Sequence, residues 1–153
     1  MPPASPPWLG IARAMLDEFV ALASRKSPRG LGRLADNAVV QAEVACAEAR
    51  LGSARAYLVE TLTTIYAQAR ETAPIEIADR ARVRLACTNA IQGAAEVTDV
   101  AYKAAGVDAI FPGSPFERRF RDMHTLSQQI QARGAHFEQV GQILLGMPPE
   151  TFL

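Results

Sequence analysis

Gly113-Ser114-Pro115-Phe116-Glu117-Arg118-Arg119-Phe120-Arg121-Asp122-Met123-His124 is the stretch around which the rest of the chain is organised. It has the sequence of a helix start: Ser114 can cap the helix, Pro115 suits the first helical position, and Glu117 completes the pattern of a capping box. Three arginines follow within two turns, where the helix dipole favours negative charge. This excess of positive charge predicts an anionic partner, which the chain itself or a bound molecule would supply.

The composition sets limits on the class of protein. With 153 residues the chain is long enough for one domain with a single core, and its formal net charge of zero provides no overall field to attract nucleic acid or an anionic membrane. The first residues lack the pattern of a signal peptide, and no apolar run approaches the length of a membrane span, so we expect a cytoplasmic protein. Cys46 and Cys87 are expected to be small buried hydrophobic residues, and no pattern indicates a metal site.

Four helices are predicted, and no stretch has the alternation of a strand. The first spans residues 8–25, the second begins after an Asp36 cap and runs to about residue 72, the third spans 75–105 and ends at Gly106, and the fourth spans 114–145. A proline-rich extension over residues 1–7 and a tail over 148–153 flank the domain at 8–147. The fold class is therefore all-α, an up-down antiparallel four-helix bundle with long second, third and fourth helices.

The second helix is too long for a small bundle to cover. At 1.5 Å per residue it would extend roughly 50–55 Å, and its apolar stripe continues along most of that length. We therefore expect part of it to pack against another domain or subunit. The apolar stripe of this helix consists of Val40, Val44, Ala47, Leu51, Ala54, Leu58, Leu62, Ile65 and Ala69.

A basic loop follows the first helix. Arg25, Lys26, Arg29 and Arg33 lie in or beside a segment that contains one proline and two glycines. Two interpretations remain open: a solvated charged loop, and a flexible clamp for a phosphate.

Residue chemistry alone identifies no catalytic site. His124 and His136 are twelve residues apart, about 120° around an ideal helix, so they do not converge on a metal. Glu117 and Ser127 are possible hydrogen-bond partners of His124. Without further information, His124 fits an interface residue better than a catalyst, and the chain is a helical bundle with a basic helix terminus.

The order of these helices and the motif from Ser114 to Asp122 resemble the C-terminal helical domain of the acyl-CoA dehydrogenase superfamily. That family has a glycine-containing turn, then Pro-Val-Glu-Arg, then Arg-Asp near the start of its last long helix. The basic loop and Gln41 are loosely similar to its Arg-x-Gln-Phe-Gly segment. The resemblance implies a protein with further helical and β-barrel domains, with flavin bound between domains and subunits. It also implies that this chain is a fragment or one half of a split enzyme, and that the isolated chain shows no turnover.

One branch of the superfamily matches best. The usual dehydrogenase base, a glutamate after the Arg-Asp pair, has no counterpart in residues 126–131, whereas His124 resembles the histidine of flavin-dependent monooxygenases that helps to deprotonate the substrate. The resemblance thus implies that His124 is catalytic and that FAD or FMN binds, together with a small-molecule substrate, a separate flavin reductase and a homodimer or homotetramer. A dehydrogenase with a relocated base and a non-catalytic oligomerisation bundle are the alternatives. The implied cofactor-binding residues are Arg25, Lys26, Arg33, Arg118 and Arg121.

Overall fold

The computed structural model describes residues 6–71 and 74–148, and these residues are helical with no strand among them. The five α-helices are α1 (Pro7–Arg25), α2 (Ala38–Arg70), α3 (Ile77–Ala105), α4 (Pro115–Ser127) and α5 (Ala135–Leu144). Three short 3-10 helices connect them: η1 (Leu34–Asp36), η2 (Gly106–Ala109) and η3 (Ile130–Ala132). The predicted all-α fold is confirmed. Most of the predicted extension and tail lies outside the described residues.

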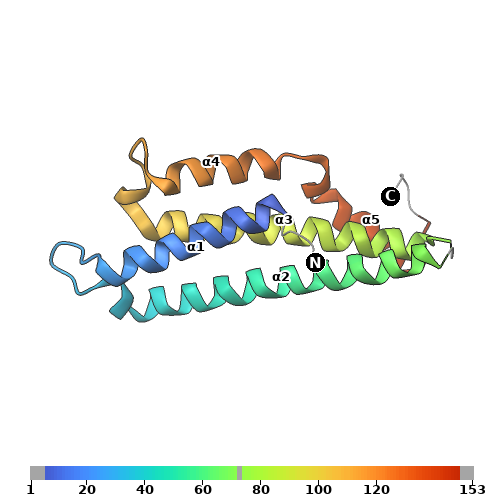
Figure 1. Ribbon diagram of the computed structural model, residues 1–153, viewed down its shortest axis with the longest axis horizontal. Helices are drawn as coiled ribbons and strands as arrows, with labels where there is room; N and C mark the ends of the chain where they lie inside the picture. Colours follow the sequence, from blue (N-terminus) through green and yellow to red (C-terminus); the bar gives the residue numbers. More distant parts are fainter. Residues whose placement is uncertain (1–5, 72–73, 149–153) are drawn as a thin grey trace.

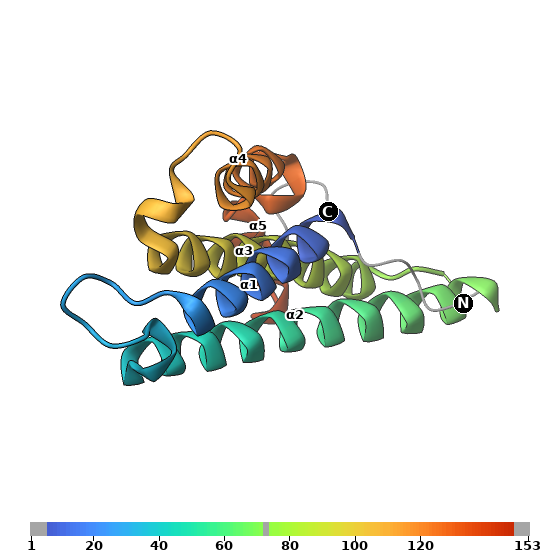
Figure 2. The ribbon, with the colours of Figure 1, turned by 60° about the vertical axis from the view of Figure 1, so that its left-hand side comes forward.

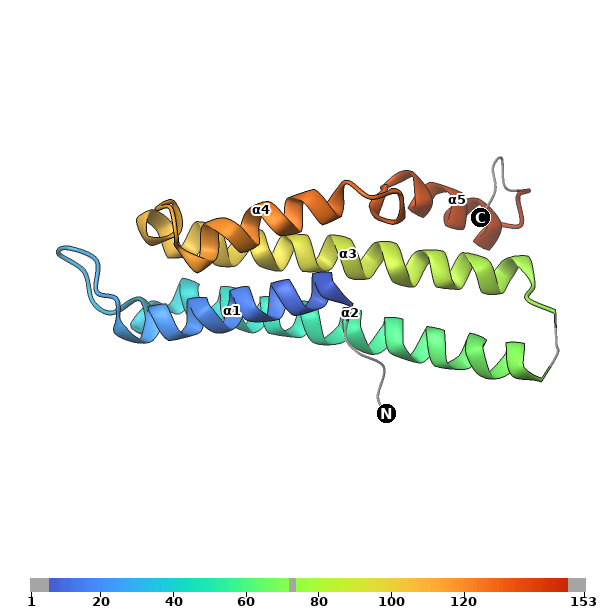
Figure 3. The ribbon, with the colours of Figure 1, turned by 45° about the horizontal axis from the view of Figure 1, so that its top comes forward.

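The central element is α3, which packs against each of the other α-helices. It lies antiparallel beside α2, while α4 and α5 follow one another along its other side (Figure 1 and Figure 3). At one end of the molecule α1, α2, α3 and α4 form the four-helix bundle, with the 26–33 loop projecting from that end (Figure 2). Towards the other end the bundle thins to α2, α3 and α5.

Two apolar clusters form the core. One joins Leu16 of α1 to Leu51 and Leu58 of α2, and the other is centred on Phe19 and Phe116. Small residues dominate where α2 meets α3, so the two helices approach closely there without large side chains between them. Ala47, Ala54, Ala86, Ala90 and Ala94 supply this contact.

The far half of α2 is poorly covered. Its buried residues end at Thr61, and the next turns expose Leu62 and Tyr66. At about 1.5 Å per residue, 33 helical residues extend roughly 50 Å, which matches the predicted length. Packing of this surface against another domain or subunit stays a prediction.

The predicted fourth helix over 114–145 is wrong as a single element, because it is divided into α4, η3 and α5. Two side chains of α3 stabilise the break by binding carbonyl groups that have left the helix: Thr88 Oγ1 donates to Gln131 O at 2.8 Å, and Gln92 Nε2 donates to Ala132 O at 3.0 Å. The break also changes which side chains beyond residue 126 face the core. Ile130 and Leu144 are exposed, while Ala132 and His136 are buried.

Two local predictions also need correction. The N-cap of α2 is Asn37, whose side chain accepts from Val39 N at 2.8 Å, while the predicted cap Asp36 is paired with Arg33. Cys46 is exposed, since it lies next to the narrow buried stripe of α2 rather than on it, and Cys87 is half-buried. Burial raises the pKa of the Cys87 thiol, although the charge of Arg84 opposes this effect.

Candidate functional site

The start of α4 confirms the predicted cap. The Ser114 hydroxyl accepts from Phe116 N at 3.3 Å and donates to Asp108 O at 2.8 Å, and Pro115 occupies the first helical position. The Glu117 half of the predicted capping box does not form, because the Glu117 carboxylate lies 3.6 Å from Arg121. The hydroxyl of Ser114 therefore joins α4 to η2.

The arginines of α4 divide into two groups. Arg119 points towards α1, where its Nη1 lies 3.6 Å from Glu18 Oε2. Arg118 and Arg121 face solvent, with 81% and 67% of their side chains exposed, and each lies 3.6–3.7 Å from a carboxylate on α4 itself. These separations exceed the 2.7–2.9 Å of a strong charge-assisted hydrogen bond, so both guanidinium groups can turn to an incoming anion. A shallow groove over residues 113–122 contains both side chains.

The residues of the basic loop have different surroundings. Lys26, with 21% of its side chain exposed, donates to Ala105 O at 2.8 Å and pairs with Asp108, so it neutralises the C-terminal end of α3. Arg33 binds Asp36 at 2.8 Å and lowers the pKa of that carboxyl group through this hydrogen bond. Arg25 is exposed and has no ion pair with any described residue. The chain thus satisfies Lys26 and Arg33 internally.

The basic loop and the start of α4 meet at the same end of the bundle. Asp108 links them, because its carboxylate pairs with Lys26 and its carbonyl accepts from Ser114. Arg33 is paired instead with Asp36 of η1.

His124 is held by a residue that the sequence analysis did not pair with it. Its Nε2 lies 2.8 Å from Asp99 Oδ1 of α3, and its ring lies 4.2 Å from that of Phe120, which stacks on Tyr102 at 4.1 Å. Neither predicted partner binds the imidazole: Glu117 pairs with Arg121, and Ser127 Oγ donates to the backbone oxygen of His124 at 2.9 Å. With 39% of its side chain exposed, His124 remains open to a ligand.

His124 and Arg121 share one side of α4. They are three residues apart, a spacing that places side chains as neighbours on a helix surface. The structure therefore brings a histidine and a loosely held arginine together at a half-open site, with Arg118 one further turn towards the helix start.

The second histidine has a different environment. His136 of α5 is 5% exposed; its Nε2 lies 2.9 Å from Arg84 Nη1 and its Nδ1 lies 3.2 Å from Thr88 Oγ1. An arginine can only donate, and Thr88 donates to Gln131, so Nε2 accepts and the Nδ1 proton is donated to Thr88. Burial lowers the pKa of His136, and the positive charges of Arg84 and Arg133 lower it further. His136 is therefore a neutral structural residue, separate from His124.

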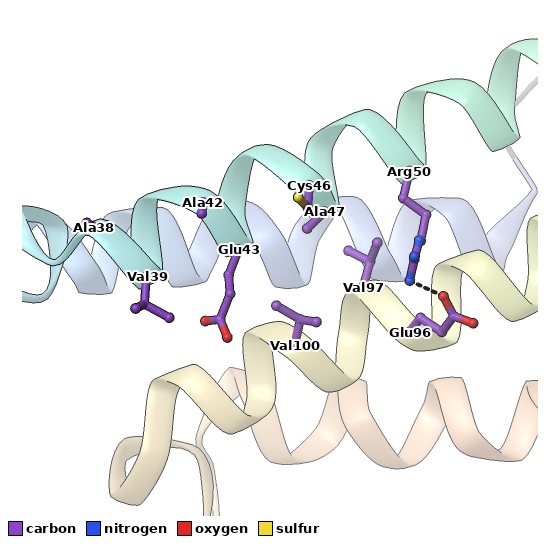
Figure 4. Close-up of a pocket in the computed structure, with 10 residues that line it drawn as sticks. All are labelled: Ala38, Val39, Ala42, Glu43, Cys46, Ala47, Arg50, Glu96, Val97 and Val100. Atoms are coloured by element: carbon purple, nitrogen blue, oxygen red, sulfur yellow. Dashed lines mark hydrogen bonds and ion pairs between the residues drawn. The ribbon is translucent and has the colours of Figure 1, made fainter.

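An apolar groove lies between α2 and α3 (Figure 4), and neither histidine is among the residues that line it. Val39, Val97 and Val100 contribute to its lining, and an ion pair between Arg50 and Glu96 spans one end of it. The exposed Cys46 lies on its wall. No sequence motif pointed to this groove.

Two further properties concern the described parts of the chain. None of the helices there is long and apolar enough to cross a membrane. Over residues 6–71 and 74–148, no three histidine, cysteine or acidic side chains gather closely enough to hold a metal ion.

Curated proteins similar to this chain are monooxygenases. The chain is 34% identical over 142 residues to an indole-3-acetate monooxygenase of Pseudomonas putida, and 32% identical over 145 residues to one of Acinetobacter baumannii. Each match covers 92% of this chain and 36% of the relative. The chain therefore spans about a third of the length of these relatives.

Solved structures share the fold. The HsaA monooxygenase of M. tuberculosis matches 95% of this chain with a TM-score of 0.81 at 23% identity, and the match covers 37% of that protein. XiaF from Streptomyces sp., solved with FADH2 and glycerol, matches 95% of this chain with a TM-score of 0.85 at 18% identity, again over 37% of its own length. A family model described as "Acyl-CoA dehydrogenase, C-terminal domain" matches residues 4–133. The chain belongs to the family of acyl-CoA dehydrogenase C-terminal domains.

Proposed function

We propose that the chain is the C-terminal helical part of a flavin-dependent monooxygenase that hydroxylates a small aromatic substrate with reduced flavin and O2. The pairing of the half-open His124 with Asp99, on the face that also carries Arg121, is the observation on which the proposal rests. Identities of 34% and 32% to two indole-3-acetate monooxygenases support it. Since the chain spans 36% of those relatives, the remaining part of the active site would come from other polypeptide.

The side chains at the start of α4 suit a flavin phosphate. Arg118 and Arg121 are largely exposed and loosely paired, and guanidinium groups beside a helix start favour a phosphate. Arg25 also has an exposed guanidinium, whereas Lys26 and Arg33 would first have to release their own carboxylates. We therefore assign phosphate binding to Arg118 and Arg121 ahead of the basic loop. FAD and FMN both carry the phosphate that these arginines would bind.

His124 would move a proton between the protein and the substrate. A neutral imidazole can accept a proton near neutral pH and return it later, which is the requirement for a general base. A bound reduced flavin supplies the two electrons and the site of O2 activation. The role of this chain is to orient the flavin phosphate and to hold His124 at the substrate.

The dehydrogenase alternative has less support from the residues. Abstraction of an acyl α-proton needs a carboxylate, and residues 126–131 contain none. Asp99, the carboxylate that contacts His124, is already hydrogen-bonded to it. The experiment below therefore also tests for acyl-CoA dehydrogenase activity.

We also propose that the protein is a homo-oligomer, a dimer or tetramer. Exposed apolar side chains on the uncovered half of α2, such as Leu62 and Tyr66, support an additional packing surface. Light scattering after size-exclusion chromatography measures the assembly, and a monomer at micromolar concentration would contradict the proposal. The separate flavin reductase and the cytoplasmic location remain predictions from the sequence.

The test of the monooxygenase uses protein isolated through a tag on this chain, with any further polypeptide that accompanies it. Reduced FAD or FMN, O2 and indole-3-acetate are supplied in one reaction, and an acyl-CoA with an electron acceptor in another. We expect a product 16 Da heavier than indole-3-acetate or a related aromatic acid, and at least a hundredfold loss for His124→Asn. The matched control is Thr125→Ala, an exposed neighbour on α4. Oxidation of the acyl-CoA without hydroxylation would establish the dehydrogenase instead.

A further inference from the structure

We infer that Asp99 is a positioning residue for His124: its carboxylate holds the imidazole with a proton on Nε2 and leaves Nδ1 as the atom that accepts the substrate proton. The catalytic meaning of this pair rests on the proposed monooxygenase function. The pair itself is a property of this chain, so it can be tested without flavin or substrate.

The hydrogen bond determines which nitrogen carries the proton. Asp99 Oδ1 lies 2.8 Å from His124 Nε2, and a carboxylate can only accept a hydrogen bond. Nε2 must therefore donate, and in a neutral imidazole the free lone pair is then on Nδ1. Among the described residues, no hydrogen bond reaches Nδ1. The acceptor nitrogen is thus the one available to a ligand.

Aromatic side chains also pack against the imidazole ring. Phe120, one turn earlier on α4, lies 4.2 Å from His124 between ring centres with the two rings tilted by 52°, and Tyr102 of α3 stacks on Phe120 at 4.1 Å. A ring rotation that exchanged the two nitrogens would break the bond to Asp99 and disturb this stack. The imidazole is therefore held by a hydrogen bond at Nε2 and by packing against an aromatic ring.

The charge of Asp99 also suits the proton transfer. When Nδ1 accepts a proton from an N–H or O–H group of the substrate, the substrate becomes an anion and the ring becomes an imidazolium, with no change of oxidation state. Nε2 keeps its hydrogen bond to Asp99 throughout, and the carboxylate compensates the new positive charge. Asp99 does not touch the substrate in this step, and so acts through His124.

A simple cross-link between α3 and α4 is the competing explanation. It would account for a loss of stability on removing Asp99, but for no specific effect on the rate. Glu96, one turn away on α3, provides the matched control, because its carboxylate also makes a cross-helix ion pair, with Arg50, outside the site. Asp99→Asn keeps an oxygen that can accept from Nε2 and removes the charge, whereas Asp99→Ala removes both.

The first measurement is NMR on the full chain labelled with ¹⁵N-histidine, with His124→Gln used for assignment. We expect a protected Nε2–H signal of His124 at low temperature in the wild type, in Glu96→Ala and in Asp99→Asn, and no such signal in Asp99→Ala. Circular dichroism confirms that each variant is folded. A protected signal that survives in folded Asp99→Ala would overturn the inference.

The second measurement is the hydroxylation rate of the tagged protein. We expect kcat to fall about 10- to 100-fold in Asp99→Ala with the KM for reduced flavin unchanged, with partial recovery in Asp99→Asn and no change in Glu96→Ala. Combining Asp99→Ala with His124→Asn should cost no more than His124→Asn alone, because the two residues act as one unit. If the loss of rate in the double variant equalled the product of the losses in the two single variants, the inference would be overturned. Absence of hydroxylation in the wild type would instead refute the proposed function. The NMR measurement would still test whether Asp99 holds the Nε2 proton of His124.

Discussion

Replacing Thr88 with valine tests how the C-terminal segment is attached to α3. The Thr88 hydroxyl is buried, donates to Gln131 O at 2.8 Å and lies 3.2 Å from His136 Nδ1. Valine has nearly the same shape but removes the hydroxyl that accepts from the buried Nδ1 of His136, and loss of such a buried partner costs about 1–3 kcal/mol. Gln131 is exposed, so its carbonyl can bind water and adds little to that cost. We therefore expect a loss of about 2 kcal/mol in the free energy of unfolding.

For a domain of 153 residues this loss lowers Tm by about 4–8 °C, which circular dichroism during heating and urea titration can both measure. Thr98→Val is the matched control, since Thr98 is also fully buried on α3 but its hydroxyl only donates to Ala94 O of the same helix, at 2.9 Å. Valine at position 98 removes a hydrogen bond within α3 and breaks no hydrogen bond to another helix. An equal loss in the two variants, or none in Thr88→Val, would refute the reasoning.

Three further predictions concern stability. Because folding lowers the pKa of His136, the unfolded chain takes up a proton on this ring at a higher pH than the folded chain does. The free energy of unfolding should therefore be unaffected by His136 above about pH 6.5 and should decrease as the pH falls below that value. Urea titrations at several pH values check this, and His136→Gln should remove this pH dependence. Gly52→Ala should stabilise α2 by up to about 1 kcal/mol, because no atom lies within 4 Å of the added methyl group; an unchanged or lower urea midpoint would contradict this. Lys26→Met should lower Tm by a few degrees through loss of its bonds to Ala105 and Asp108, more than Arg33→Met, whose ion pair is exposed.

Local patterns predicted much of this fold because they depend on neighbouring residues. Ser114 and Gly106 mark the helix ends that they were expected to mark, and the buried part of α2 follows its predicted stripe as far as Leu58. The break after Ser127 escaped prediction, because its stabilisation comes from Thr88 and Gln92, which are about 40 residues away in sequence.

The pairing of Asp99 with His124 is another long-range contact that periodicity cannot reveal. A signal was nevertheless present: the apolar surface of the third helix is interrupted by polar residues, and Gln92, Glu96 and Asp99 each bind a different neighbouring element. Polar interruptions in a buried helix thus indicate cross-helix hydrogen bonds, although not their partners.

The two histidines show why one fits a proton-transfer role and the other does not. Both are bound to α3, but His136 is buried and its Nε2 accepts from the guanidinium of Arg84, which opposes a positive charge on the ring. His124 is half-open and donates to the carboxylate of Asp99, which accommodates an imidazolium. Because the break between α4 and α5 lets the two rings contact α3 at separate places, one bundle holds a neutral structural histidine and a histidine that can take up and release a proton. The distribution of charge along α3, more than the motif at the start of α4, therefore supports the proposal that His124 is the base.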